Sequence, residues 1–163
     1  MVYKIKGVHN RHFELFDEND NPAGRLDYIN LLSSKADITL ANGNVYHIAH
    51  AGIFGISIEI EHNDNVIGTL KFNWKSQVII NFGDSETYVF KGKGFWHHHY
   101  VLLDGAGNEL AIIHPDFEWS KMSHDYEIEM NPAHQDKAKN ILLPLILTFC
   151  ANLAISTGAS GAI

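Results

Sequence analysis

The chain has 163 residues, of which 45% are hydrophobic and 19% charged, so its composition excludes a disordered protein and its length suits one domain spanning residues 1–163. A formal net charge of −7 excludes a general binder of nucleic acid and predicts that binding to anionic membranes is weak or absent. The single cysteine, Cys150, excludes an intrachain disulfide framework and, with no apolar secretory segment at the N-terminus, predicts a cytoplasmic protein.

Residues 1–130 have the pattern of a β protein. Short runs rich in β-branched and aromatic residues alternate with clusters of Asn, Asp and Gly that are typical of turns. The predicted strands cover residues 12–16, 24–29, 37–41, 45–49, 56–61, 66–73, 77–82, 87–91, 97–103, 109–114 and 125–130. In residues 56–61 three isoleucines alternate with polar residues, which predicts one buried and one wet face. Such alternation favours antiparallel pairing.

The turns contain a weak internal repeat. The pattern N-D-N-x-x-G-x-L occurs at residues 19–26 and again at residues 63–70, and a looser copy occupies residues 104–110. Asn, Asp and Gly tolerate the positive φ angles of tight hairpins, and the glycine that follows indicates a β-bulge. Repeated ligand-binding loops are the alternative interpretation, but this turn chemistry is sufficient for repeated hairpins, which we expect here.

The C-terminal part has a different character. Asn131 and Pro132 are a suitable N-cap and first helical residue, and we expect a helix within residues 132–157. Residues 141–155 are apolar on every side, which requires burial in protein or in lipid. We expect a buried core helix rather than a membrane anchor, because Pro144 and Asn152 interrupt the apolar run. Asn152 then needs a buried hydrogen-bond partner or a place at the end of the barrel.

About a dozen short antiparallel strands followed by one apolar C-terminal helix form an unusual order. This layout, the Asx–Gly hairpins and the apolar segment 142–155 resemble the tubby C-terminal-like superfamily, which includes the LURP-one-related proteins and the phospholipid scramblases. The resemblance covers the whole chain. It implies a mainly β fold in which a closed antiparallel barrel of about 11–12 short strands wraps around one buried, hydrophobic C-terminal helix.

The functions of these relatives transfer poorly to this sequence. Tubby domains hold phosphoinositides with a basic cluster, whereas Lys71, Lys75, Lys91 and Lys93 are scattered along this chain. Scramblases carry a cysteine-rich segment and an acidic calcium-binding stretch, and neither pattern occurs here. The LURP-one-related branch is the nearest in size. Similarity of fold is weak support for a function in any case.

Histidines of a predicted hairpin form the one candidate metal site. If Leu103 faces Asn108 across the turn, His97 lies opposite His114, and His99 follows two residues further along the same face. Asp116 would supply a fourth ligand. Three imidazoles and a carboxylate suit Zn²⁺ or another divalent metal, and no other cofactor is expected. A turn one residue longer would instead bring His98 beside His114. The histidines would then be polar residues at a strand end and would not form a metal site.

Other chemistry-bearing residues give weaker signals. Large aromatic side chains fall near predicted strand ends: Trp74, Phe95, Trp96, Tyr100, Phe117 and Trp119. They could form a stacking groove, although packing in the core and at the rim is the commoner role of aromatic residues in strands. Cys150 lies in the most apolar segment, so we expect a protonated packing residue rather than a nucleophile.

No nucleophile elbow, phosphate-binding loop or dinucleotide fingerprint is present. The sequence therefore favours a non-enzymatic binding or interaction module for a protein or lipid ligand, with its oligomeric state left open. One alternative is a divalent-metal-binding protein or metal-dependent enzyme using His97, His99 and His114. Another is a membrane-lipid-associated, scramblase-like protein. A hollow barrel that carries an apolar ligand is less suited, because the helix has no polar face to turn outward.

Overall fold

The computed structural model describes residues 1–30, 35–52, 57–83, 86–94, 99–134 and 141–157. Twelve strands form one closed antiparallel barrel, in which each strand pairs with its neighbours in the sequence and β1 pairs with β12. The strands are β1 (Val2–Val8), β2 (His12–Phe16), β3 (Pro22–Asn30), β4 (Lys35–Leu40), β5 (Val45–Ala51), β6 (Ser57–His62), β7 (Asn65–Phe72), β8 (Val78–Phe82), β9 (Glu86–Lys93), β10 (His99–Leu103), β11 (Glu109–Glu118) and β12 (Ser123–Met130). Among the described residues, a 3₁₀ turn, η1 (Pro132–His134), and the α-helix α2 (Leu142–Thr157) follow the strands. The mainly β barrel with a C-terminal helix is confirmed.

The alternation seen in the sequence sets the two faces of the barrel wall. Ile58 and Ile60 of β6 are buried, and the intervening Glu59 and Glu61 lie on the outer face. The same period of two operates in the other strands and directs one apolar set toward the barrel axis. A barrel of this kind leaves no strand edge unpaired.

The first strand was missed by the sequence analysis, which predicted no strand before residue 12. In β1, Tyr3 and Ile5 are buried and alternate with the exposed Lys4 and Lys6. The alternation of apolar and polar residues was present in the sequence but short, and the charged Lys4 and Lys6 made it less apparent. The pairing of Ile5 with Tyr126 of β12 and with Leu15 of β2 closes the barrel.

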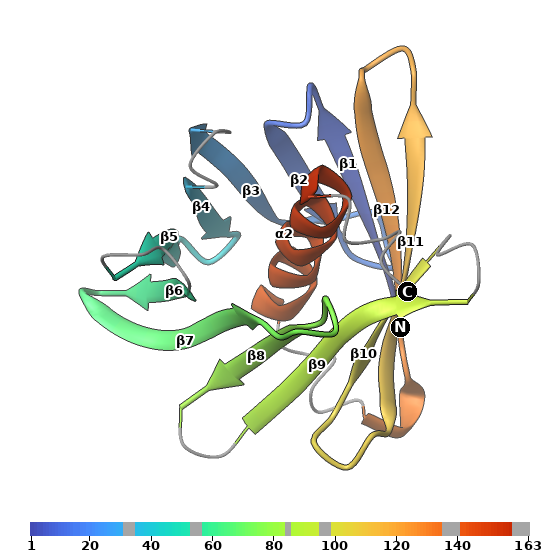
Figure 1. Cartoon of the computed structure of the whole chain (residues 1–163). Coiled ribbons are helices and arrows are strands. Elements are labelled where there is room, and N and C mark those ends of the chain that lie inside the picture. Colours follow the sequence, from blue (N-terminus) through green and yellow to red (C-terminus); the bar gives the residue numbers. More distant parts are fainter. Residues whose placement is uncertain (31–34, 53–56, 84–85, 95–98, 135–140, 158–163) are drawn as a thin grey trace.

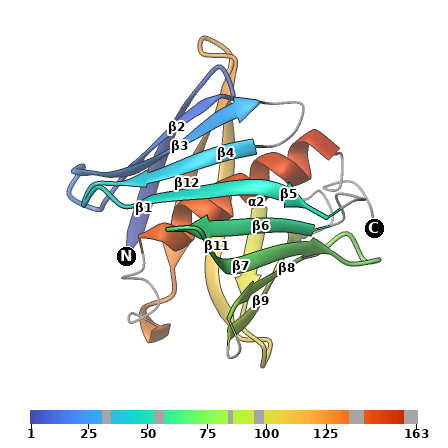
Figure 2. The ribbon, with the colours of Figure 1, turned by 90° about the vertical axis from the view of Figure 1, so that its left-hand side faces the viewer.

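The helix α2 lies inside the barrel, with strands around it (Figures 1 and 2). Twelve of its sixteen residues are buried, from Leu142 to Ala154 with Asn152 partly exposed. The predicted core helix is thus confirmed, and within the described residues no helix has both the length and the apolar character needed to cross a bilayer. Pro132 begins the 3₁₀ turn η1, which Asn131 caps, and α2 begins at Leu142; residues 135–140 of the expected helix lie outside the described residues. This start places Pro144 in the first turn, where its missing N–H has no cost.

The internal repeat is structural. In its three copies the ladder shifts register at the same place, beside Ala23, Ile67 and Leu110. Each shift lies two residues after the last asparagine of the turn, which is Asn21, Asn65 or Asn108. The predicted bulges are confirmed, and a bulge inserts one extra residue into one strand of the pair.

The up-and-down topology gives the barrel two different ends. Connections from odd-numbered to even-numbered strands, such as β1–β2 and β11–β12, lie at the end where α2 stops at Thr157; we call this end the C-terminal mouth. Connections from even-numbered to odd-numbered strands lie at the opposite end, the N-terminal mouth, with the start of α2.

Candidate functional site

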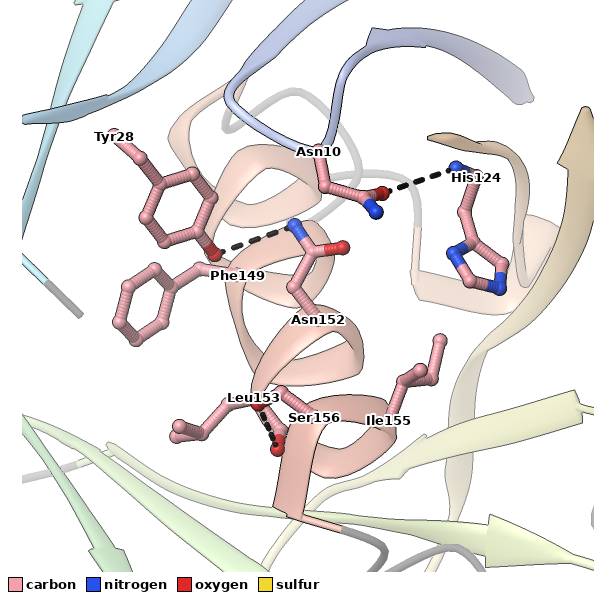
Figure 3. Close-up of a pocket in the computed structure, with 8 residues that line it drawn as sticks. All are labelled: Asn10, Tyr28, His124, Phe149, Asn152, Leu153, Ile155 and Ser156. Atoms are coloured by element: carbon pink, nitrogen blue, oxygen red, sulfur yellow. Dashed lines mark hydrogen bonds between the residues drawn. The ribbon is translucent and has the colours of Figure 1, made fainter. Parts of the chain in front are cut away.

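A cavity of about 310 Å³ opens at the C-terminal mouth, beside the last turns of α2 (Figure 3). Its apolar walls come from Phe149, Leu153 and Ile155 of the helix. Polar side chains from the β1–β2 turn, β3, β12 and α2 complete the lining: Asn10, Tyr28, His124, Asn152 and Ser156. An apolar chamber with a few convergent polar groups is the common form of a small-molecule site.

Asn152 is the central polar group of this cavity. Its Oδ1 accepts a hydrogen bond from the Tyr126 hydroxyl at 2.6 Å, and its Nδ2 donates to the Tyr28 hydroxyl at 3.2 Å. The sequence expectation that Asn152 needs a partner or a place at the end of the barrel is met on both counts. The amide has a second N–H, and the Tyr28 hydroxyl can also donate. These groups give the cavity hydrogen-bonding capacity beyond the internal network.

Aromatic rings form the floor beneath this network. Tyr28 stacks on Phe149 with ring centroids 5.7 Å apart. The Phe13 ring meets the Tyr28 ring edge-on and the Tyr126 ring at a tilt, with centroids 6.1 Å apart in both pairs. Burial raises the pKa of the Tyr28 and Tyr126 phenols well above their ordinary value. Both hydroxyls therefore stay protonated and remain donors at physiological pH.

Two hairpins hold the polar rim of the cavity in place. Asn10 lies in the β1–β2 turn with φ of 53°, a left-handed conformation that asparagine tolerates. Its backbone N–H donates to the Ser123 hydroxyl at 3.2 Å, and its Oδ1 accepts from the His124 N–H at 3.4 Å. The amides of Asn10 and Asn152 point toward one another (Figure 3). At Gly7 a side chain is excluded, because a Cβ would lie 2.3 Å from the His124 carbonyl oxygen.

His124 is the residue of the lining whose ordinary pKa lies near neutral pH. Its ring packs against Phe117 at 4.9 Å and Tyr126 at 6.1 Å. Desolvation lowers the pKa of His124, and the negative charge of Asp116 opposes this shift in part. The cavity is therefore lined by groups that are neutral at pH 7, which favours a neutral ligand with an apolar body and one or two hydrogen-bonding groups.

The hairpin that carries the predicted metal ligands has a different register from the expected one. Leu103 pairs with Glu109 rather than with Asn108, and the bulge at Leu110 shifts the remaining pairs by one further residue. Tyr100 consequently pairs with Ile113, and the rings of His99 and His114 lie 5.6 Å apart. The expected register, with Leu103 facing Asn108, is wrong, because the turn and the bulge each add one residue.

The four predicted metal ligands are only partly described. His97, like His98, lies outside the described residues. His114 and Asp116 share the outer face of β11, where His114 Nε2 lies 3.4 Å from Glu129 Oε1 and Asp116 pairs with Asp125 of β12. Over the described part of the chain, no three His, Cys, Asp or Glu side chains converge on a point that could hold a metal ion. A site that includes His97 stays a prediction.

Most of the cavity residues were missed by the sequence analysis. Asn152 carried a signal, since it is the one amide in the apolar helix. Tyr28, His124 and Asn10 come from segments far apart in the chain and share no motif. Only the barrel brings them within reach of α2.

Comparisons with known proteins bear on the fold alone. No family model and no curated protein sequence matches the chain. Among solved structures, the chain is similar to an X-ray structure of a protein from Arabidopsis thaliana, with 14% sequence identity, a TM-score of 0.54 and coverage of 90% of each chain. At this identity the similarity indicates a shared fold and carries no function.

Proposed function

We propose that this protein is a non-enzymatic binding module whose ligand is a small, neutral, amphipathic molecule held at the C-terminal mouth. One observation carries the proposal: at this end of the barrel the apolar walls from α2 meet the Asn152 amide and the Tyr28 hydroxyl in one cavity. The volume of about 310 Å³ suits a molecule of modest size.

The fold similarity and the layout of the chain support placement in the tubby C-terminal-like superfamily, on its LURP-one-related branch. The single buried Cys150 supports a reducing, cytoplasmic environment. These assignments concern family and location, and the ligand class is argued from the cavity alone.

A neutral fluorescent amine, N-phenyl-1-naphthylamine, is a suitable probe because it combines an apolar body with one N–H group. We expect its fluorescence to rise on saturable binding to the native chain. Ser156→Trp should abolish that rise, because Ser156 lines the cavity and is exposed enough to accept a larger side chain. Thr157→Trp is the matched control, since Thr157 is also exposed but does not line the cavity. Equal binding by both variants would contradict the proposal.

A second candidate function is divalent-metal binding on the outer face of β10 and β11. The apposition of the His99 and His114 rings favours it, and His97 and Asp116 are the further ligands that the sequence predicts. Protein purified without metal-affinity resin should then contain stoichiometric zinc, and a His99→Ala and His114→Ala double variant should lose it. Metal-free native protein whose melting temperature does not change on zinc addition would eliminate this candidate.

A further inference from the structure

The two mouths of the barrel differ in their exposed apolar side chains. Four of the most exposed ones lie at the C-terminal mouth: Trp74 (88% exposed), Trp119 (77%), Met122 (56%) and Ile29 (54%). The exposed apolar residues at the N-terminal mouth are Met1, Val45 and Val66, none of them aromatic. Largely exposed tryptophans are costly to keep in water, so the presence of Trp74 and Trp119 at one end indicates a surface that is covered in use.

The charged residues of the described connections are also divided between the two mouths, with basic residues at the C-terminal mouth and acidic residues at the N-terminal mouth. In the described connections of the C-terminal mouth the formally charged residues are Arg11, Lys75 and Lys121, and no Asp or Glu occurs there. In the described connections of the N-terminal mouth no Lys or Arg occurs, and the acidic residues are Asp17, Glu18, Asp20, Asp64 and Asp104. The net charge of −7 is thus a poor guide to the C-terminal mouth.

In the described part of the rim, three of the most exposed apolar residues are evenly spaced, and the less exposed Val8 at the end of β1 lies between two of them. Ile29 ends β3, Trp74 lies between β7 and β8, and Trp119 lies between β11 and β12. In a ring of twelve strands these positions are four strands apart, so three contact points surround the mouth. The hairpin β11–β12 projects from the barrel well away from the β7–β8 turn (Figure 1).

Each contact point has a lysine beside it. Lys35 begins β4 across from the end of β3. Lys75 lies over the Trp74 ring at 5.0 Å from its centroid. Lys121 lies two residues after Trp119, and its Nζ forms an ion pair with Asp125 Oδ2 at 2.7 Å. Tryptophan next to lysine is the pairing that favours the boundary between lipid headgroups and acyl chains.

We propose that the C-terminal mouth docks onto an anionic lipid bilayer, with Ile29, Trp74 and Trp119 inserted at three points and lysines against the lipid phosphates. A bilayer is planar and yields locally, so it accepts separated protrusions at the same time. A protein partner would need a contiguous central patch, because binding hot spots cluster in well-packed pockets. The docking uses the rim residues and does not require a ligand in the cavity.

The test is flotation of the full chain with vesicles of phosphatidylcholine that contain about 30 mol% phosphatidylserine. We expect co-flotation and quenching of tryptophan fluorescence by brominated acyl chains. The double variant Trp74→Ser and Trp119→Ser should bind at least about tenfold more weakly, because two large apolar side chains no longer enter the lipid. Val45→Ser with Val66→Ser at the N-terminal mouth is the matched control and should bind as the native chain does. Melting temperatures check that each variant folds.

Four results would overturn the proposal. Two of them are a native chain that stays unbound at low salt and a double tryptophan variant that binds as well as the native chain. Loss of binding in the presence of soluble inositol hexakisphosphate would assign it to a headgroup site instead of to insertion. A native dimer in light scattering that the tryptophan variant lacks would assign the rim to a second copy of the chain. Flotation measured without any added cavity ligand separates this proposal from the cavity, since the docking uses the rim residues alone.

Discussion

At the scale of single residues, Asn152 has two tasks. It satisfies the buried Tyr126 hydroxyl, and it offers an amide to the cavity. Leaving a buried polar group without its partner costs more free energy than forming one hydrogen bond gains. Asn152 therefore stabilises the fold whether or not a ligand occupies the cavity.

Asn152→Ala should destabilise the protein by about 1–3 kcal/mol, because the Tyr126 hydroxyl then lies buried without its acceptor. Urea denaturation measures this change. Tyr126→Phe added to Asn152→Ala should cost less than the sum of the two single changes, since it removes the unsatisfied hydroxyl. Strict additivity of the two changes would show that the hydrogen bond does not couple these residues.

His124 makes stability depend on pH. Burial lowers its pKa in the folded state, so the unfolded chain binds a proton more readily below the ordinary histidine value of about 6.5. The contribution of neutral His124 is fully present above that pH and is lost as the pH falls toward the folded-state pKa. His124→Gln should therefore flatten the fall of the urea midpoint between about pH 7.5 and 5. An unchanged slope would exclude this residue as a source of the pH dependence.

Cys150 is enclosed on all sides by the core. It is fully buried, and desolvation raises the pKa of its thiol above the ordinary value. A thiol reagent such as 5,5′-dithiobis(2-nitrobenzoic acid) should therefore react with the native protein only as fast as the barrel opens. The reaction should accelerate through the urea transition, and rapid reaction of the folded protein would place the thiol outside the core.

At the scale of elements, α2 is the core on which the strands close. Phe149 is fully buried, and its ring stacks on Tyr28. Leu145 contacts the wall at Gly24, where a Cβ would lie only 3.0 Å from the leucine side chain. The helix and the wall are therefore fitted to one another, and neither is expected to persist alone.

Phe149→Ala should cost about 3–5 kcal/mol, because it leaves a cavity in the centre of the core. Ile155→Ala, a change near the exposed end of the same helix, is the matched control and should cost less. Chemical denaturation of both variants gives the comparison. Deletion of residues 141–163 should yield insoluble protein, and a soluble, folded barrel without these residues would refute the central role of α2.

At the scale of the whole molecule, closure depends on a single strand. β1 forms hydrogen-bonded ladders with both β2 and β12, so every strand of the barrel has two neighbours. Removing it would expose two edges, which are templates for pairing with other chains.

Deletion of residues 2–8 should therefore convert the protein to aggregates or strand-paired oligomers, as measured by size-exclusion chromatography with light scattering. Lys4→Ser with Lys6→Ser tests the same strand on its outer face and should leave the native oligomeric state intact. A folded deletion variant with that same state would mean that the remaining strands close without β1.

Local patterns in the sequence were enough to predict antiparallel strands and a buried helix. Alternation in segments such as residues 56–61, Asx–Gly turns and a helix apolar on all sides carry that prediction, whereas the closed barrel around the helix was implied by the resemblance of the layout to a known superfamily. These features are local, and their physical causes act over a few residues. The strand β1 was within reach of the same reasoning, since Tyr3 and Ile5 alternate with lysines.

Only the tertiary structure decided which residues meet. The histidine register depended on a bulge at Leu110, and one inserted residue changes every pair beyond it. The cavity joins Asn10, Tyr28 and His124 to α2, and the rim joins Trp74 to Trp119, across separations that no local pattern encodes. Closure of the barrel creates these neighbours, because the position of each strand around the ring depends on all the others.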